Sequence, residues 1–235
     1  MDFKILTTKD KIWFSVAGLV VVAIIGAIIY FGKPLTVITV PVEITAEQRA
    51  NTEKQIADIR QQLENCESEA DKCYELYLQL GINYESLGEI SRAIDTYEDA
   101  IDAKGDTYVP YSNIGSIYAR LKDFAKAEEF YKKAIEISPN NASVYTKLFE
   151  LYFYNQQKSY FEMEAFFPIA LKDTNYDPNI VRLYAYWADS VNDPATAIKA
   201  WKAVLQYEPD NEAAKQKLEA ATKKLQEEEK ILNNR

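Results

Sequence analysis

The chain has 235 residues, with 36 Asp and Glu against 27 Lys and Arg and no His, so its formal net charge is −9 and its pI is near 4.8. The absence of histidine excludes Ser-His-Asp and Cys-His nucleophile pairs and histidine metal ligands, and two cysteines alone do not make a structural zinc site. The acidic balance argues against a nucleic-acid partner, because phosphate binding requires a clustered basic surface.

An uncharged run occupies residues 12–31, reading IWFSVAGLVVVAIIGAIIYF between Lys11 and Lys33. At about 1.5 Å of rise per residue, a helix of this length matches the ~30 Å hydrocarbon core of a bilayer. The run therefore predicts a transmembrane helix over 12–32, after a short tail at 1–11. A cleaved signal peptide is the alternative, but its apolar region should be only about 7–15 residues long and should end in a small-x-small site.

The lysines around this run predict its orientation. Lys4, Lys9 and Lys11 precede it, whereas only Lys33 follows it before Arg49. Because positive residues are retained on the cytoplasmic side, we expect a single-pass membrane protein with a cytoplasmic N-terminus. The rest of the chain is then extracytoplasmic.

An extended linker and a helix follow. Residues 33–45 are rich in β-branched residues and contain Pro34 and Pro41, a composition that favours extended backbone. Thr45 and Gln48 have the spacing of a capping box, and apolar residues then recur at helical intervals. This pattern predicts an amphipathic helix from about 46 to 65 that lays one apolar stripe on the domain after it.

The two cysteines, Cys66 and Cys73, fall in the loop that completes the segment 46–73. On one continuous helix they would lie about 10 Å apart, too far for a bridge, but in a loop they can meet. An oxidising compartment would favour a disulfide between them. Two unpaired thiols are the alternative.

Seven residues recur at a fixed period of 34 in the middle of the chain. Tyr77, Leu80, Gly81, Tyr84, Ala93, Tyr97 and Ala100 align with Tyr111, Ile114, Gly115, Tyr118, Ala127, Tyr131 and Ala134. The pattern resembles the tetratricopeptide repeat (TPR), in which small residues sit where helices A and B approach and aromatic residues fill the space around them. The resemblance implies an all-α solenoid over 74–211 that begins with repeats 74–107 and 108–141.

Two further repeats are less regular. Residues 178–211 keep Ala185, Ala197 and Trp201 at small and aromatic positions of the pattern. Residues 142–177 have Phe149 where glycine is expected and exceed 34 residues, so we expect an irregular repeat whose helices are pushed apart.

The last segment, 212–235, has Leu218, Ala221 and Leu225 on one stripe among many charged residues. A solenoid of about four repeats needs a polar end, because its last repeat otherwise exposes an apolar face. We interpret this segment as a C-terminal capping helix.

The resemblance also places a candidate peptide-binding groove on the concave wall, where helix A side chains face away from helix B. The candidate groove residues are Leu78, Ile82, Glu85, Asn113, Ser116, Arg120, Glu150, Tyr154, Arg182 and Tyr186. Chaperone-binding members of the family grip a carboxylate with five polar and basic groups. Asn113 and Lys147 match that set, but Leu78, Ile82 and Ser143 do not, so this clamp is excluded.

These features predict a binding protein rather than an enzyme, with no cofactor, no metal and no small-molecule substrate. The leading hypothesis is a membrane-anchored scaffold that holds a protein or peptide partner in its groove, near the bilayer reached through residues 12–32. One N-terminal span followed by acidic outward repeats is similar to the ancillary subunit of the bacterial Sec translocon, which implies a role in protein secretion or envelope protein assembly. An accessory or regulatory subunit of an envelope enzyme complex and an assembly factor for pili or other surface structures are the alternatives.

Overall fold

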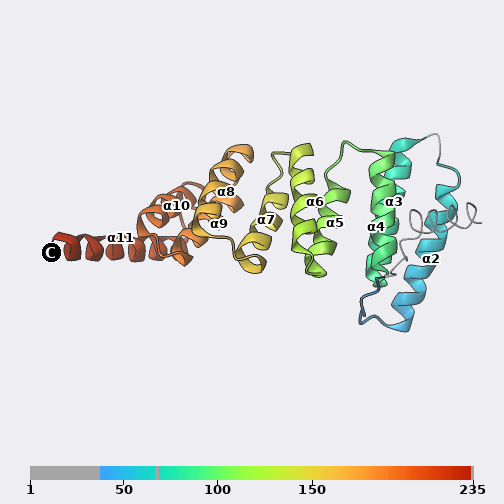
Figure 1. The fold of residues 1–235 in the computed structure, drawn as a ribbon, viewed down its shortest axis with the longest axis horizontal. Coiled ribbons are helices and arrows are strands. Elements are labelled where there is room, and N and C mark those ends of the chain that lie inside the picture. Colours follow the sequence, from blue (N-terminus) through green and yellow to red (C-terminus); the bar gives the residue numbers. More distant parts are fainter. Residues whose placement is uncertain (1–37, 67–68, 234–235) are drawn as a thin grey trace, which may run out of the picture.

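The computed structural model describes residues 38–66 and 69–233. Helices stack side by side along one axis, from α2 (Ala46–Leu63) at one end to α11 (Glu212–Asn233), which leads to the C-terminus, at the other (Figure 1). Between them lie four successive helical pairs, so the expected all-α helical repeat is present. No helix in the described residues is long and apolar enough to cross a bilayer, and the span predicted over 12–32 lies outside them.

The first two pairs are regular hairpins: α3 (Ala70–Ser86) with α4 (Ile90–Ala103), and α5 (Val109–Arg120) with α6 (Phe124–Ile137). Glycine allows their close approach. A methyl group on Gly81 would lie 2.5 Å from Cε1 of Tyr97, and one on Gly115 would lie 2.7 Å from Cδ1 of Tyr131. Both rings are buried directly against the glycine backbone.

The third pair is irregular, as the sequence predicts. Helix α7 (Ala142–Glu150) continues into one turn of π-helix, η1 (Leu151–Asn155), before α8 (Tyr160–Asp173) begins. Phe149 is buried and stacks on Phe153, with ring centroids 5.3 Å apart. Helices α7 and α8 do not pack closely along their lengths as α3 and α4 do, and α7 packs on α9 (Pro178–Ser190) instead.

The C-terminal end is closed by α11. It packs on α10 (Pro194–Tyr207), the partner of α9, and buries Ala214 and Ala221 there. Leu218 and Leu225 are half-buried on the same stripe, and the remaining positions are largely charged. The helix therefore gives the last pair a polar outer face, as a solenoid end requires.

At the other end, α2 packs on α3 through Ile56 and Ile59. Its capping box is present, with Thr45 and Gln48 each accepting a hydrogen bond from the backbone N–H of the other. The structure joins Cys66 and Cys73 in a disulfide, with their Cα atoms 5.4 Å apart. The loop between α2 and α3 is shorter than expected, because α3 begins at Ala70 and Cys73 lies in its first turn.

The buried side chains form two hydrophobic clusters. The N-terminal cluster gathers residues of α2 to α5, from Ile56 to Ile117, with half-buried neighbours from Ile44 to Phe130. The C-terminal cluster runs from Ala127 to Ala221 and contains most of the aromatic residues of the third and fourth pairs. The half-buried ring of Tyr118 contacts both clusters, so they meet in the second pair.

Candidate functional site

One face of the solenoid is lined by the first helix of each pair, α3, α5, α7 and α9. Two polar contacts cross it between neighbouring pairs. Arg120 of α5 forms an ion pair with Glu85 of α3, and the ammonium of Lys147 on α7 donates to the hydroxyl of Ser112 on α5 over 2.8 Å. We call this surface the A-helix face.

Glu85 is held on this face from behind. The buried Tyr97 of α4 donates its hydroxyl to the Glu85 carboxylate over 2.8 Å. Burial raises the pKa of Tyr97, and the neighbouring Glu85 charge raises it further, so the phenol stays protonated and remains a donor. Glu85 is thus fixed by one neutral donor and one cation.

Lys147 differs from the surface lysines. It is half-buried, and this burial lowers its pKa, while the charges of Glu85 and Glu150 act in the opposite direction. Within the described residues, Ser112 is the only hydrogen-bond acceptor placed on its ammonium. An ammonium has three donors, so Lys147 retains capacity for a carbonyl or carboxylate of a partner.

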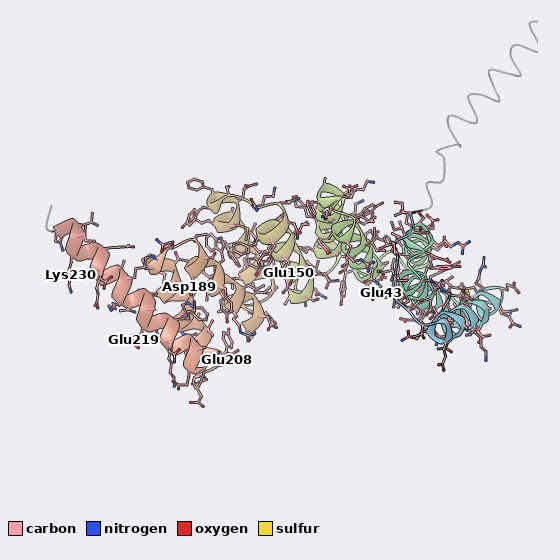
Figure 2. The ribbon with its side chains drawn as sticks, turned by 90° about the horizontal axis from the view of Figure 1, so that it is seen from below. Glu43, Glu150, Asp189, Glu208, Glu219 and Lys230 are labelled. Carbon is pink, nitrogen blue, oxygen red and sulfur yellow. A yellow bond between two sulfur atoms is a disulfide. The ribbon has the colours of Figure 1, made fainter. Side chains whose placement is uncertain are left out.

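The structure brings part of the predicted groove together. Glu85, Asn113 and Ser116 are half-buried near the two buried tyrosines, and Ser116 accepts a hydrogen bond from Tyr131 over 3.3 Å. Glu150 is exposed near the middle of the stack (Figure 2).

Among the aromatic and aliphatic candidates, exposure separates surface from core. Tyr154 on η1 is 66% exposed, Ile82 is 53% exposed and Tyr186 is 51% exposed. The ring of Tyr186 meets Trp201 edge-on with centroids 5.1 Å apart, which holds its orientation. Leu78, by contrast, is half-buried against the N-terminal cluster and contributes mainly to packing.

Arg182 is committed to another contact. It pairs with Glu208, the residue that follows α10, and Glu208 also accepts from Asn211. These hydrogen bonds lower the pKa of Glu208 and keep its carboxylate charged. Arg182 therefore ties the start of α9 to the end of α10, and its side chain remains partly exposed.

Sequence reasoning missed a second surface, a cleft of about 430 Å³ between α6, α7 and α8. It opens because α8 stands away from α7. Its walls are mostly apolar and include Ile135, Leu148, Tyr152, Phe166 and the exposed Ile169. These residues are far apart in sequence, so no local pattern predicts the cleft.

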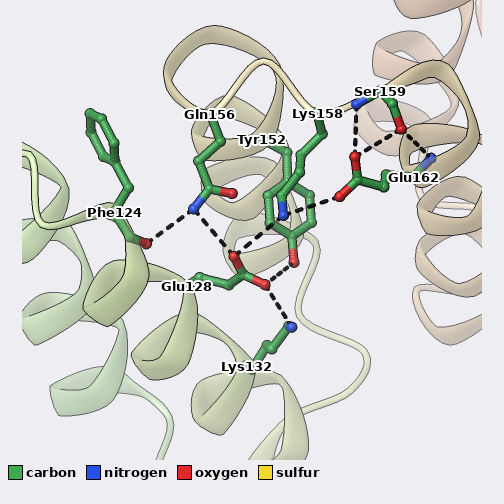
Figure 3. A network of polar contacts seen from close by, with 8 residues as sticks. All are labelled: Phe124, Glu128, Lys132, Tyr152, Gln156, Lys158, Ser159 and Glu162. Carbon is green, nitrogen blue, oxygen red and sulfur yellow. Dashed lines mark hydrogen bonds and ion pairs between the residues drawn. The ribbon is translucent and has the colours of Figure 1, made fainter.

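A polar network holds one rim of this cleft (Figure 3). Glu128 of α6 accepts from Tyr152 over 3.0 Å, from Gln156 over 3.2 Å and from Lys132 over 2.7 Å. Burial disfavours the Glu128 charge, but these hydrogen bonds outweigh it and lower the pKa of this carboxyl. Burial and the Glu128 charge raise the pKa of Tyr152.

The described residues contain no group of three or more Cys, Asp and Glu side chains placed to hold a metal ion. The polar groups of the A-helix face are donors, acceptors and paired charges, and its exposed groups include two tyrosine rings. This arrangement suits the binding of a polypeptide with both polar and aromatic contacts.

Comparisons with known proteins agree with the repeat pattern. Models described as tetratricopeptide repeat match residues 74–107 and 108–141, the bounds expected for the first two pairs. Residues 74–141 are therefore tetratricopeptide repeats, a helical scaffold for protein–protein interaction. None of the curated proteins searched matches the chain.

Several solved structures have a similar fold. The crystal structure of BtubC (BKLC) from P. vanneervenii is 18% identical with a TM-score of 0.55, covering 77% of this chain and 85% of that one. YrrB, described as a TPR protein with an unusual peptide-binding site, is 15% identical with a TM-score of 0.49, covering 69% of this chain and 81% of its own. MamA is 17% identical with a TM-score of 0.46, covering 81% and 99%. At these identities the likeness concerns the fold alone.

Proposed function

We propose that this tetratricopeptide repeat chain is a membrane-anchored scaffold that binds an extended protein segment on its A-helix face. The observation that carries the proposal is Lys147 of α7, a half-buried cation with one acceptor among the described residues. The exposed rings of Tyr154 and Tyr186 belong to η1, which continues α7, and to α9, the first helix of the next pair. Lys147 supplies a donor for a backbone carbonyl or carboxylate of the partner. The two rings supply apolar area with a polar edge, which is typical of residues that dominate binding energy.

The membrane anchor is the predicted span at 12–32, with the repeats on the extracytoplasmic side. The uncharged run and the lysines before it support this topology. The Cys66–Cys73 disulfide is compatible with this topology, because disulfides persist in oxidising compartments. An extracytoplasmic position makes protein secretion or envelope protein assembly the proposed setting of the scaffold.

Partner capture tests the binding surface. We expect Tyr154→Ala with Tyr186→Ala to leave helix content unchanged and to weaken capture about tenfold or more, since interface tyrosines of this kind act as hot spots. The measurement is photo-crosslinking of the full chain in native membranes, followed by identification and quantification of the crosslinked partner.

A matched control uses Tyr176→Ala with Tyr207→Ala, which removes two tyrosines of similar exposure outside the four A helices. Capture should survive in this variant. Equal loss in both variants, or no loss in the first, would remove the A-helix face from the proposal.

Compartment is tested separately by protease accessibility of a C-terminal tag in spheroplasts with a cytoplasmic control protein. We expect the tag to be digested while the control survives. Protection of the tag until the membrane is lysed would reject the extracytoplasmic topology and the secretion or envelope setting.

A further inference from the structure

The described chain begins at an edge of the solenoid, not at its end. Ile38 donates its N–H to the Ser91 hydroxyl over 2.7 Å and accepts from the Ser91 N–H over 3.2 Å, and Val40 donates to the Gly88 carbonyl over 2.9 Å. Gly88 lies in the turn between α3 and α4 with a φ of 75°, and a methyl group there would meet the Val40 carbonyl oxygen at 2.0 Å. The described part of the linker before α2, residues 38–45, which we call the connector, therefore packs directly on this turn.

This attachment determines which edge lies nearest the anchor. Figure 1 shows the connector at the foot of α3 and α4, on the same edge as the turn between α5 and α6. In the proposed topology, on which this inference rests, the span ends at residue 32. The residues from there to Ile38 can extend only about 20 Å at ~3.3–3.6 Å each. The edge formed by the A–B turns is thus held close to the bilayer surface.

The A–B turns of the second and third pairs are basic in an acidic protein. Residues 119–126 and 156–162 contain four cations, Arg120, Lys122, Lys126 and Lys158, against two anions, Asp123 and Glu162. The turns at the other end of the same pairs, 136–142 and 171–178, contain Glu136, Asp173 and Asp177 against one lysine, Lys172. The charge asymmetry points the basic edge toward anionic lipid.

The two basic turns are physically joined. Gln156 donates to the Phe124 carbonyl over 3.3 Å, and Lys158 lies 3.2 Å from Glu162 (Figure 3). Beside them α8 begins with Tyr160, which is 37% exposed, and Phe161, which is 78% exposed. Aromatic side chains with this exposure suit the boundary between headgroups and acyl chains.

Three cations of this edge are available to lipid phosphates, whereas Lys158 is only 27% exposed and pairs with Glu128 and Glu162. Lys122 is exposed, and the described residues offer it no ion-pair partner. Arg120 pairs with Glu85 and Lys126 pairs with Asp123 at 3.3 Å, but both side chains are more than half exposed. Exposed ion pairs are weak, so these cations can exchange partners at a charged surface.

We infer that the basic edge of the second and third pairs, formed by Arg120, Lys122, Lys126, Tyr160 and Phe161, docks onto an anionic lipid bilayer and sets the orientation of the solenoid on the membrane. The repeats then lie with their A–B turns against the headgroups. The turns at the other end of the second and third pairs, which carry Glu136, Asp173 and Asp177, point away from the membrane.

Hydrogen exchange of the full chain in lipid nanodiscs tests this inference. We compare discs that contain phosphatidylglycerol with discs of phosphatidylcholine alone. Amides of 119–126 and 156–162 should exchange more slowly in the anionic discs. Lys122→Glu with Lys126→Glu should abolish the slowing, because each cation near an anionic surface contributes about fivefold to the docking equilibrium. Lys199→Glu with Lys202→Glu, an equal charge change at exposed positions of α10, should preserve it.

The outcomes separate this inference from the anchor itself. If the chain inserts into both kinds of disc but these amides exchange equally fast, the docked edge is wrong and the anchor stands. If the chain does not insert, the proposed anchor is wrong and the docked edge falls with it. Slowing that is the same in both discs, or that survives the Lys122 and Lys126 reversal, means that another partner covers the edge and also overturns the inference.

Discussion

Replacing Gly115 by alanine should destabilise the second repeat. The added methyl group would lie 2.7 Å from Cδ1 and 2.8 Å from Cε1 of Tyr131, well inside the ~3.5–4.0 Å of favourable carbon contact. The ring of Tyr131 is only 3% exposed, so it has little room to move away. Overpacking of this kind costs about 1–3 kcal/mol. Both contacts are shorter than 3 Å, which places the overpacking cost in the upper part of this range. Alanine recovers about 1 kcal/mol as the better helix former, so we expect a net loss of about 1–2 kcal/mol.

Amide exchange of the full chain in detergent measures this loss, read as the opening free energy of α5 and α6. The loss should be smaller when Tyr131→Leu is already present, because the clashing ring is gone. Gly105→Ala is the control, since its methyl group would meet its nearest neighbour at an ordinary 3.5 Å. A Gly115→Ala variant as stable as the parent, or one that Tyr131→Leu does not relieve, would refute the reasoning.

Two further predictions concern the disulfide at the N-terminal end of the repeats and the carboxylate of Glu128 in their middle. Cys66→Ser with Cys73→Ser should lower the free energy of unfolding by about 2–3 kcal/mol, because the disulfide no longer restricts the unfolded chain. Amide exchange in α2 should become faster, and unchanged exchange there would contradict this prediction. The lowered pKa of Glu128 stabilises the fold above the unfolded value near 4.3, and this stability is lost as pH falls through the folded pKa. In the Glu128→Gln variant, the opening free energy of α6–α8, measured by amide exchange, should therefore fall less between about pH 5 and pH 3 than in the parent chain. An unchanged acid limb would show that Glu128 is not the titrating group.

Much of the fold follows from local patterns in the sequence. The 34-residue spacing predicts the first two hairpins because Gly81 and Gly115 must lie under Tyr97 and Tyr131. The capping box at Thr45 predicts the start of α2 to the residue. Ser159 and Glu162 form a similar box at the start of α8, so that boundary was also readable.

The remaining features depend on contacts between distant residues. The seat of the connector joins Ile38 to Ser91, which are 53 positions apart, and requires the left-handed backbone of Gly88. The cleft beside α8 likewise depends on how far the third pair opens, which the position of Phe149 predicts only in direction.

The A-helix face could be predicted from the sequence in part. Its contacts Arg120 with Glu85 and Lys147 with Ser112 both join residues 35 positions apart, one more than the repeat period. Scanning the sequence for complementary polar residues at this offset would have found them. The contacts of Leu78 with the N-terminal cluster and of Arg182 with Glu208 could not be read from this spacing, because they depend on the packing of neighbouring helices.

The division of the interior into two clusters has a consequence for folding during synthesis. All members of the N-terminal cluster, including its half-buried neighbours, lie between Ile44 and Phe130. A chain emerging from its N-terminus therefore carries a complete first core once α6 has emerged, before any of the third or fourth pair is present. Because each repeat contacts mainly its neighbours, this half can fold first and serve as the template on which the aromatic C-terminal half assembles.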